Sequence, residues 1–390
     1  MSVMNKRILY VGHYRENSGW GEASRNYILA MDRAGLDVIC RPVIFNGNAN
    51  IPDRIKELEK KEGEKPSINI QHVLPHLMCY DGSYEKNIGM FVSETYGIKN
   101  TSWFNKLKMM DQIWIPAKGM VDEEAGFPYY KVRVIPHAFD IDEYDRGHGA
   151  IDFGDENPNY KFYYIGELNR RKNVISLLKA FHIEFGRHEP VSLVLKVYRP
   201  GHSSLQTKEA LDKITSDIKS ALGIYKDMSH YKSEIFIGDT LSRKDMLALH
   251  NSCDCFVNPS FGEAWGMPLF DAYAMKKAVV SSNNAGPLEY INDGNRMYGC
   301  ISVDRGYAVL PEELEPISCS DKVFDDFGSA RFEEWSRPNI NCLRYYMRAM
   351  YNNGKKRYDD RDVSKYSLLS IGNKIKETLN EQPRGHNSKF

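Results

Sequence analysis

The sequence predicts an α/β protein made of two domains, each built on a parallel sheet. Three observations lead to this fold class. The chain has 390 residues, which is more than one typical domain. Short apolar segments rich in Val and Ile alternate with segments of helical length, as in βα repeats. A polar stretch rich in Asp, Gly and Asn, residues 143–159, divides the repeats into two series, which predicts domains at residues 1–150 and 158–360.

The first series opens as strand, glycine-rich turn and helix. Arg7–Val11 is a compact apolar run, typical of a parallel strand buried on both faces. The apolar positions of Glu22–Ala34 fit one helix face, and Gly35 is a natural stop after it. Val38–Val43 then resumes a strand, which completes a βαβ unit. Further strands are expected at Ser67–Gln71, Ile88–Val92, Gln112–Ile115 and Val132–Ile135.

The second series repeats the alternation and is followed by a helical tail. Its regularity predicts a parallel sheet with helices on both faces. The tail is expected to be helical over Arg331–Asn353 and Lys365–Leu379. Strands are expected at Phe162–Ile165, Val191–Val197, Ile235–Ile237, Cys253–Val257 and Ala278–Ser281, and helices at Asn173–Phe185, Thr207–Ala221, Arg243–His250 and Pro268–Met275.

Composition excludes several classes of protein. Lys and Arg total 52, as do Asp and Glu, so the chain lacks the basic excess of a nucleic-acid-binding protein. No apolar run approaches the ~18 residues of a spanning helix, and the N-terminus does not have the pattern of a signal peptide. The seven cysteines are scattered without Cys-x-x-Cys spacing, which favours reduced thiols and a cytoplasmic protein without a metal site. The short basic runs at Lys60–Lys61 and Lys355–Arg357 are solvent faces, or else peripheral contacts with anionic lipid at the inner membrane face.

The most informative segment runs from Asn258 into the predicted helix at Pro268. A strand ends at Val257, and a loop containing Glu263 leads to Pro268, a residue suited to the first helical position. Free amides at a helix start form a ready diphosphate site. Asp271 follows one turn inside the helix, so the two acids can bracket a ligand. Acids at helix N-termini also serve simply as caps, and the residues alone leave both interpretations open.

This segment resembles the Glu-x7-Glu motif of retaining glycosyltransferases of the GT-B fold, in particular family 4, the group 1 glycosyltransferases. The resemblance extends over nearly the whole chain. It implies two Rossmann-like domains facing a deep interdomain cleft, with a C-terminal helix at about 363–381 that packs back on the first domain. Other segments similar to the family's motifs are Ser18–Glu22, Asp111–Pro116, Val134–Asp140, Tyr164–Asn173 and Phe236–Ser242.

The resemblance also implies roles for individual residues on the donor side. Glu263 contacts the donor sugar beside the reacting carbon, Asp271 holds the ribose hydroxyls, and Lys172 neutralises the diphosphate. The backbone of Ala264, Trp265, Gly266 and Met267 approaches the distal phosphate and the sugar. The N-domain loop containing Gly19 and Gly21 closes on the donor, and the loop containing Thr240 meets the nucleobase.

The sequence departs from the family pattern at three positions. Asp271 stands where Glu is usual, so the ribose contact is shorter or weaker. Glu167 stands where an Arg is usual, and Arg171, next to Lys172, is expected to supply the missing cation. Glu94 takes the place of a His near the sugar, where it orients the acceptor or caps a helix. His72 is a further acceptor-side candidate, although a loop histidine is usually only solvated.

The implied function is retaining, metal-independent transfer of a hexose from a nucleotide diphosphate-sugar, with no cofactor. UDP is slightly favoured over GDP because Ser242 stands where GDP-using relatives place a carboxylate. The acceptor is a glycan, a lipid-linked molecule or another hydroxyl compound in surface polysaccharide synthesis. The alternatives are another GT-B-like enzyme, such as an epimerase or a phosphorylase, and a non-catalytic nucleotide-sugar-binding protein.

Overall fold

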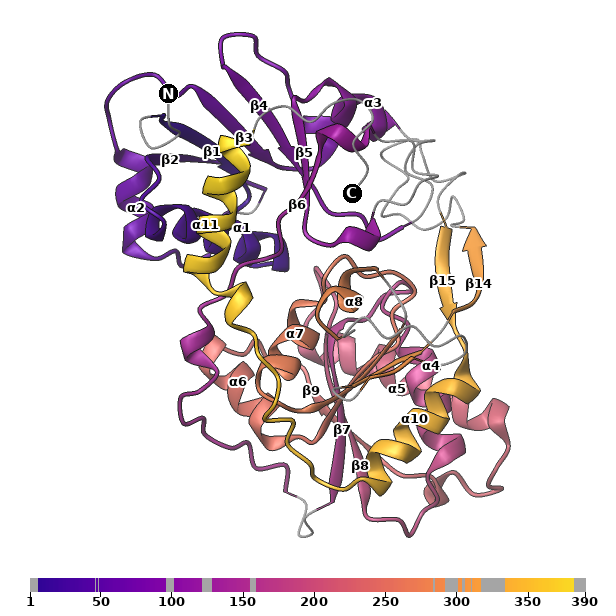
Figure 1. Ribbon diagram of the computed structural model, residues 1–390. Helices are drawn as coiled ribbons and strands as arrows, with labels where there is room; N and C mark the ends of the chain where they lie inside the picture. Colours follow the sequence, from indigo (N-terminus) through magenta and orange to yellow (C-terminus); the bar gives the residue numbers. More distant parts are fainter. Residues whose placement is uncertain are drawn as a thin grey trace. The chain divides into compact units, whose positions relative to one another are not determined.

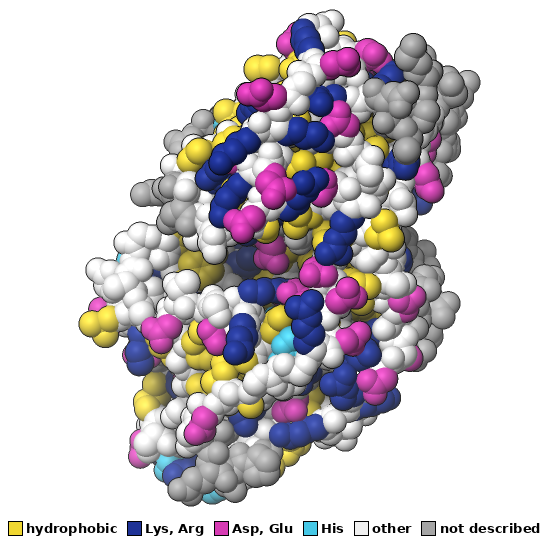
Figure 2. Space-filling view, turned by 90° about the vertical axis from the view of Figure 1, so that its left-hand side faces the viewer, with side chains coloured by type: hydrophobic (Ala, Val, Ile, Leu, Met, Phe, Trp, Pro, Cys, Tyr) yellow, Lys and Arg dark blue, Asp and Glu magenta, His cyan; other side chains and the backbone are white. Residues whose placement is uncertain are grey.

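The computed structural model describes residues 6–45, 47, 49–95, 102–120, 128–154, 159–282, 285–291, 301–303, 306–309, 311–316 and 334–381. The chain forms two compact units, each described here by itself. Unit 1 consists mainly of residues up to Glu143 and from Asp362 onward, and unit 2 of Tyr144–Glu315 and Trp335–Arg361. Acidic and basic side chains are interspersed over the face in Figure 2, in keeping with a net charge of zero.

Unit 1 is built on a six-stranded sheet in the order β2-β1-β3-β4-β5-β6, with all neighbouring strands parallel (Figure 1). Its strands are mostly buried, as in a parallel sheet covered on both faces. The strands are β1 (Ile8–Gly12), β2 (Val38–Pro42), β3 (Ile68–His72), β4 (Lys86–Met90), β5 (Gln112–Ile115) and β6 (Val132–Val134). The helices are α1 (Gly19–Arg33), α2 (Asp53–Lys60), α3 (Ser102–Met109) and α11 (Leu368–Asn380).

The C-terminal helix α11 packs against α1 within unit 1 (Figure 1). Its apolar residues share one core with residues of α1 and of strands β1 to β4. The two helix backbones approach closely at Gly372, where an added Cβ would lie 2.0 Å from the carbonyl oxygen of Ala30. The segment before α11 is joined to residue 139 by hydrogen bonds from Phe139 N to Tyr366 O, at 2.9 Å, and from Leu368 N to Phe139 O, at 3.0 Å. The buried apolar residues of α11 are Leu368, Ile371, Ile375 and Leu379.

Unit 2 is built on a seven-stranded sheet in the order β12-β13-β11-β10-β7-β8-β9, parallel except for the β12–β13 pair. The strands are β7 (Tyr160–Glu167), β8 (Val191–Tyr198), β9 (Glu234–Ile237), β10 (Cys255–Asn258), β11 (Ala278–Ser282), β12 (Ile301–Val303) and β13 (Gly306–Val309). The helices are α4 (Val174–Glu184), α5 (Ser204–Leu222), α6 (Arg243–Ser252), α7 (Met267–Ala274), α8 (Ala285–Ile291) and α10 (Ile340–Asn352).

The structure differs from the sequence-based prediction at two element boundaries. Residues 334–338, expected to be helical, are strand β15 (Glu334–Pro338), which pairs with β14 (Pro311–Pro316) in a separate two-stranded sheet. Pro338 explains the difference, because a proline disfavours the helical conformation in the residue before it. Helix α7 begins at Met267, so Pro268 occupies its second position and not the first. Residues 331–333 of the expected helix lie outside the described residues.

Two other expectations concern cysteines and membrane helices. Cys40, Cys79, Cys253, Cys255 and Cys342 are free thiols. Cys300 and Cys319 lie outside the described residues. In the described ranges, no helix combines the length and apolar character needed to cross a bilayer.

Candidate functional site

The strand order of unit 2 defines one place where ligands are expected. From β7 the chain passes through α4 to β8 on one side, whereas the neighbour of β7 on the other side is β10. In open parallel sheets, ligands bind at the carboxyl ends of strands where the order reverses in this way. The loops that leave β7 and β10 at this edge are residues 168–173 and 259–266.

These two loops are joined to each other by direct hydrogen bonds. Phe261 N donates to Arg171 O at 2.8 Å, and Asn173 Nδ2 donates to Pro259 O at 2.9 Å. Asn173 has a φ of +53° and also caps α4, because its Oδ1 accepts a hydrogen bond from Ser176 N. Asn is one of the few residues that adopt this left-handed conformation at low cost. The loop positions are therefore fixed relative to each other without a ligand.

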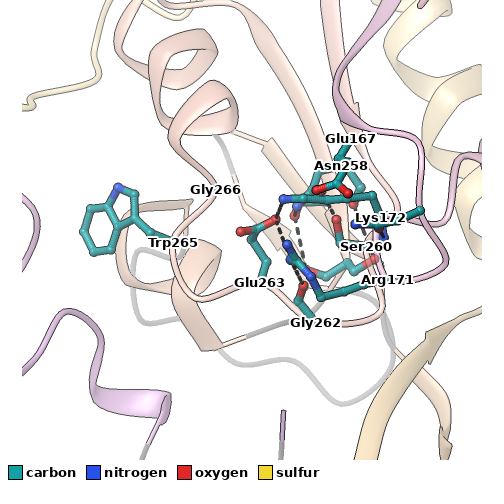
Figure 3. Close-up of polar contacts among 12 residues, drawn as sticks. Glu167, Arg171, Lys172, Asn258, Ser260, Gly262, Glu263, Trp265 and Gly266 are labelled. Atoms are coloured by element: carbon teal, nitrogen blue, oxygen red, sulfur yellow. Dashed lines mark hydrogen bonds and ion pairs between the residues drawn. The ribbon is translucent and has the colours of Figure 1, made fainter. Parts of the chain in front are cut away.

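Glu263 lies between two cations at this point (Figure 3). Its carboxylate accepts a short hydrogen bond from Lys172 Nζ, and its Oε2 lies 3.7 Å from Arg171 Nη1. Arg171 also donates to Gly262 O at 2.9 Å, which fixes its guanidinium against the loop. All three charged side chains are at most 17% exposed. They form a compact charged cluster, named here the Glu263 cluster.

Glu263 is ionised although it is buried. Burial by itself raises the pKa of this carboxyl, but Lys172, Arg171 and a hydrogen bond with Ser260 outweigh the burial and hold the pKa below its usual value. Lys172 and Arg171 thus bring two cationic side chains into a poorly solvated place, where water screens their charge weakly.

The loop after Glu263 turns directly into helix α7. Gly266 adopts a φ of +81° at the N-cap, a conformation that favours glycine. The first-turn amides of α7 therefore start next to the Glu263 cluster, where the positive end of the helix favours negative charge. Ala264 and Trp265 are buried, and Figure 3 shows the Trp265 ring pointing away from Glu263. Tyr290 donates a hydrogen bond to Trp265 O at 2.7 Å, which holds the loop from behind.

Asp271 is fully engaged with protein partners that the sequence did not reveal. Arg243 donates to both of its oxygens, at 2.6 and 3.0 Å, and Tyr144 donates to Oδ1 at 2.7 Å. Burial raises the pKa of this carboxyl, but Arg243, His250 and Tyr144 lower it by more. The pKa therefore lies below its usual value. Arg243 is the first residue of α6, just after the loop that follows β9. Its position at a predicted helix start, near the carboxyl edge of the sheet, could have marked it as a candidate site residue. No sequence pattern indicated Tyr144, which lies in the stretch predicted as a linker.

The other predicted site residues fall into two groups. Thr240 is exposed in the loop between β9 and α6, on unit 2, and Glu167 is the half-buried last residue of β7. The other group, Gly19, Gly21, His72 and Glu94, lies on unit 1. Gly19 and Gly21 are in the first turn of α1 and not in the loop expected from the sequence, and His72 is the last residue of β3 and not a loop histidine. His72 is buried, and its Nδ1 contacts Tyr10 Oη at 2.7 Å and Ser24 Oγ at 3.1 Å. Glu94 is half-buried in the loop after β4.

Gly21 has a steric role that the sequence did not suggest. An added Cβ would lie 2.0 Å from Glu16 O, so only glycine permits this approach of α1 to the preceding loop. Arg25 donates to Tyr14 O and Glu16 O, at 2.9 and 3.0 Å, and holds the same loop. Across the described part of the chain, the structure contains no group of three His, Cys, Asp or Glu side chains arranged to hold a metal ion.

Comparisons with known proteins match this architecture. Structures similar over nearly the whole chain include the Anabaena protein HepE in complex with UDP and glucose, with a TM-score of 0.55 and 12% identity over 96% of this chain and 99% of that one. The lipopolysaccharide outer core galactosyltransferase WaaB has a TM-score of 0.60 and is 11% identical, over 96% of this chain and 99% of that one. The chain therefore has the GT-B fold, which confirms the predicted α/β class with two domains on parallel sheets.

The sequence comparisons match part of the chain. Residues 159–314 match the family model Glycosyl transferases group 1, so this part of the chain is similar to that family. Sucrose synthase of Thermosynechococcus vestitus is 22% identical over 233 residues, which are 56% of this chain and 26% of that protein. The capsular polysaccharide glycosyltransferase CapM of Staphylococcus aureus is 20% identical over 197 residues, 50% of this chain and 47% of CapM. The matched regions thus span about a quarter and about half of these curated relatives.

Proposed function

We propose that this chain is a retaining, metal-independent glycosyltransferase that needs no cofactor. It moves a hexose from a nucleotide diphosphate-sugar to a hydroxyl of a glycan or glycolipid acceptor in surface polysaccharide synthesis. It acts in the cytoplasm, with at most peripheral contact with the inner membrane face. The observation that carries the proposal is the buried, ionised Glu263 held between Lys172 and Arg171 at the reversal point of the unit 2 sheet.

The Glu263 cluster supplies what breaking a glycosyl–phosphate bond requires. Negative charge develops on the departing diphosphate, and Lys172, Arg171 and the first-turn amides of α7 are fixed donors that stabilise it. The ionised Glu263 positions Lys172 and accepts hydrogen bonds from hydroxyls of the donor sugar. The bond from the anomeric carbon to the acceptor oxygen forms on the face that the phosphate leaves, and the departing phosphate takes the acceptor's proton.

UDP is the favoured nucleotide. The HepE structure contains UDP and glucose, which supports a uridine donor for a chain with the same fold. Ser242 provides no carboxylate for a guanine edge, and its hydroxyl is used at the start of α6, where it accepts from Asp245 N at 3.2 Å. Asp271 is not free to bind ribose while Arg243 occupies both of its oxygens, so we expect Arg243 to take part in the nucleotide contact.

The test is turnover of UDP-glucose by the purified chain, measured as UDP release with and without acceptor. Lys172→Met removes a donor to the developing charge and is expected to lower kcat about 10²- to 10³-fold. Glu263→Gln is expected to lower it as well, because it frees Lys172 and removes an acceptor of hydroxyl hydrogen bonds. Lys219→Met is the matched control, since Lys219 also pairs with a mostly buried glutamate, Glu234, but at the amino end of β9, the opposite edge of the unit 2 sheet.

Three outcomes would contradict parts of the proposal. Equal turnover by Lys172→Met and Lys219→Met would show that the Glu263 cluster has no part in catalysis. Binding of UDP without any turnover would identify a non-catalytic nucleotide-sugar-binding protein. Inversion of the anomeric centre, detected by NMR of the product, would exclude the retaining mechanism, and loss of activity in EDTA would exclude metal independence.

A further inference from the structure

Unit 2 contains a cavity that is distinct from the Glu263 cluster, named here the α4–α5 cavity. Its volume is about 680 Å³, within the range of about 300–1,000 Å³ that is usual for small-molecule sites. Helices α4, α5 and α10 share one core on one side of the sheet, and α6, α7 and α8 lie on the other side (Figure 1). Residues of α4, α5 and α10 line the cavity. Among the described residues none of α6 or α7 does so, although these two helices carry Arg243 and Asp271.

The walls of the α4–α5 cavity are mainly apolar. Val174, at the start of α4, and Pro338, at the end of β15, are buried. The side chains of Ile214, Phe261 and Ile340 are half-buried there. Apolar walls with a small number of polar groups are typical of sites that bind small molecules. The ligand that fits these walls has an apolar body, because its transfer from water into such a cavity is favourable.

Three polar side chains at this cavity are not used within the described part of the chain. Lys179, on α4, and Arg199, just after β8, are half-buried, and neither forms an ion pair or a hydrogen bond with a described residue. Ser176, in the first turn of α4, is only 8% exposed, and its Oγ likewise has no hydrogen-bond partner there. A buried polar group usually has a partner, so the Ser176 hydroxyl indicates a ligand in the cavity.

The charge at the α4–α5 cavity favours an anion. None of the described residues that line it is acidic, whereas Lys179, Arg199 and Arg170 are all cationic. Arginine and lysine side chains are the usual partners of phosphate, and arginine can donate two parallel hydrogen bonds to one phosphate group. Together with the apolar walls, these cations define an amphipathic ligand, a phosphate attached to an apolar body.

The α4–α5 cavity and the Glu263 cluster are built on the same two loops but share no side chain. Asn173 and Phe261 line the cavity, whereas Lys172, Arg171 and Glu263 do not. The two loops are joined by the hydrogen bonds from Phe261 N to Arg171 O and from the Asn173 side chain to the backbone of the other loop. A ligand in the cavity therefore contacts residues that hold the Glu263 cluster in place.

We propose that the α4–α5 cavity binds a compact, soluble organic phosphate with an apolar body, and that this ligand is an effector of the nucleotide site. The phosphate accepts hydrogen bonds from Arg199, Lys179 and Ser176 Oγ, and the apolar body lies against the walls. An anion bound on the loops that carry the Glu263 cluster makes the binding of a second anion there less favourable, and such coupling is reciprocal. The effect on the nucleotide rests on the proposed function, whereas the binding of the phosphate does not.

Binding is measured by isothermal titration calorimetry on the full chain, with octyl phosphate, octanol and inorganic phosphate as probes. Only octyl phosphate carries both an apolar body and a phosphate, so it is expected to bind at least about 10-fold tighter than either of the others. Equal affinity for octyl phosphate and octanol, or for octyl phosphate and inorganic phosphate, would overturn the inference. Binding to vesicles that contain phosphatidic acid, without binding of octyl phosphate, would overturn it in favour of a lipid head group.

Five variants locate the binding on the chain. Lys179→Met and Arg199→Met are each expected to weaken binding of octyl phosphate about 10-fold, the worth of one charge-assisted hydrogen bond. Ala210→Trp, at a half-buried position of α5 that lines the cavity, fills it and should abolish binding. Lys213→Met removes an exposed lysine of α5 that does not line the cavity and is the matched control. Lys172→Met should keep the wild-type affinity, which separates the cavity from the Glu263 cluster.

The effector role is measured as the Kd of UDP with and without saturating octyl phosphate. We expect UDP to bind about 5-fold more weakly with it, at the lower end of usual coupling between sites, and to be unaffected in Ala210→Trp. An unchanged Kd in the wild type would overturn the effector role, and unchanged octyl phosphate binding in Ala210→Trp and Arg199→Met would overturn the site itself. UDP-glucose turnover without octyl phosphate tests the proposed function separately, so the two failures are distinguishable.

Discussion

At the scale of single residues, the two acids of the motif differ in what they have available for a ligand. Glu263 lies between Lys172 and Arg171, next to the first turn of α7, where negative charge is favoured. Asp271 receives both donor groups of Arg243 and the hydroxyl of Tyr144, which satisfies most of its hydrogen-bonding capacity. The shorter acid at position 271 is therefore a fixed anchor for Arg243. From the sequence alone, both acids were expected to contact the ligand, Glu263 at the donor sugar and Asp271 at the ribose.

Asp271→Asn should reveal this anchoring as a stability effect with a defined pH dependence. The folded-state pKa of Asp271 lies below its ordinary value of 3.8, so its contribution is present above that pH and is lost as the pH falls through the folded-state pKa. We expect the substitution to lower the free energy of unfolding of unit 2 by about 1–3 kcal/mol at pH 7, measured by urea denaturation. The difference from wild type should be constant down to about pH 5 and should shrink below about pH 4.

A surface aspartate provides the matched control for this prediction. Asp212 pairs with Lys208 on α5 and is 59% exposed, so Asp212→Asn should change stability by less than ~0.5 kcal/mol. Equal effects of the two substitutions would mean that the Asp271–Arg243 pair behaves as an ordinary surface ion pair. A difference that persists unchanged at pH 3 would mean that the charge of Asp271 is not responsible.

At the scale of elements, the sequence predicted most strands because strands buried on both faces are rich in apolar residues. Gln112–Ile115 coincides with β5, and Ala278–Ser281 is one residue short of β11. The sequence also located the charged loops, but it did not predict which side chains in them contact each other. Arg243, Tyr144 and Asp271 are far apart in sequence, and no periodicity records that they meet.

The packing of α11 on α1 depends on a glycine, and this gives a second prediction. Gly372→Ala replaces a poor helix former by a good one, which in an exposed helix stabilises by up to about 1 kcal/mol. Here the added Cβ would meet Ala30 O at 2.0 Å, so the helices must separate. We expect a net loss of about 1–3 kcal/mol in the stability of unit 1, measured by thermal or urea unfolding.

Asn373→Ala, at an exposed position of the same helix, is the control for this change. It should leave stability unchanged or raise it slightly, because alanine is the better helix former. If Gly372→Ala were as harmless as Asn373→Ala, α11 would not pack closely on α1. That result would also weaken the assignment of residues after Asp362 to unit 1.

At the scale of the whole molecule, the two units share one type of sheet arrangement. Each unit has its own apolar core and a parallel sheet whose strand order reverses once beside its first strand. The chemistry at the two reversal points differs: charged residues meet the helix start in unit 2, whereas neutral histidines and aromatic rings gather in unit 1.

Hydrogen exchange in the presence of UDP should locate the nucleotide along the chain. A ligand at 100 times its Kd stabilises the unit that binds it by about 2.7 kcal/mol, so backbone amides that open with that unit exchange more slowly. We expect the largest slowing in peptides covering 167–173 and 259–271, and clearly less in Lys172→Met at the same UDP concentration. Additional slowing at Ser18–Glu22 would support the donor contact predicted for Gly19 and Gly21. Slowing confined to unit 1 would contradict the assignment, because the cations that a diphosphate requires are grouped in unit 2.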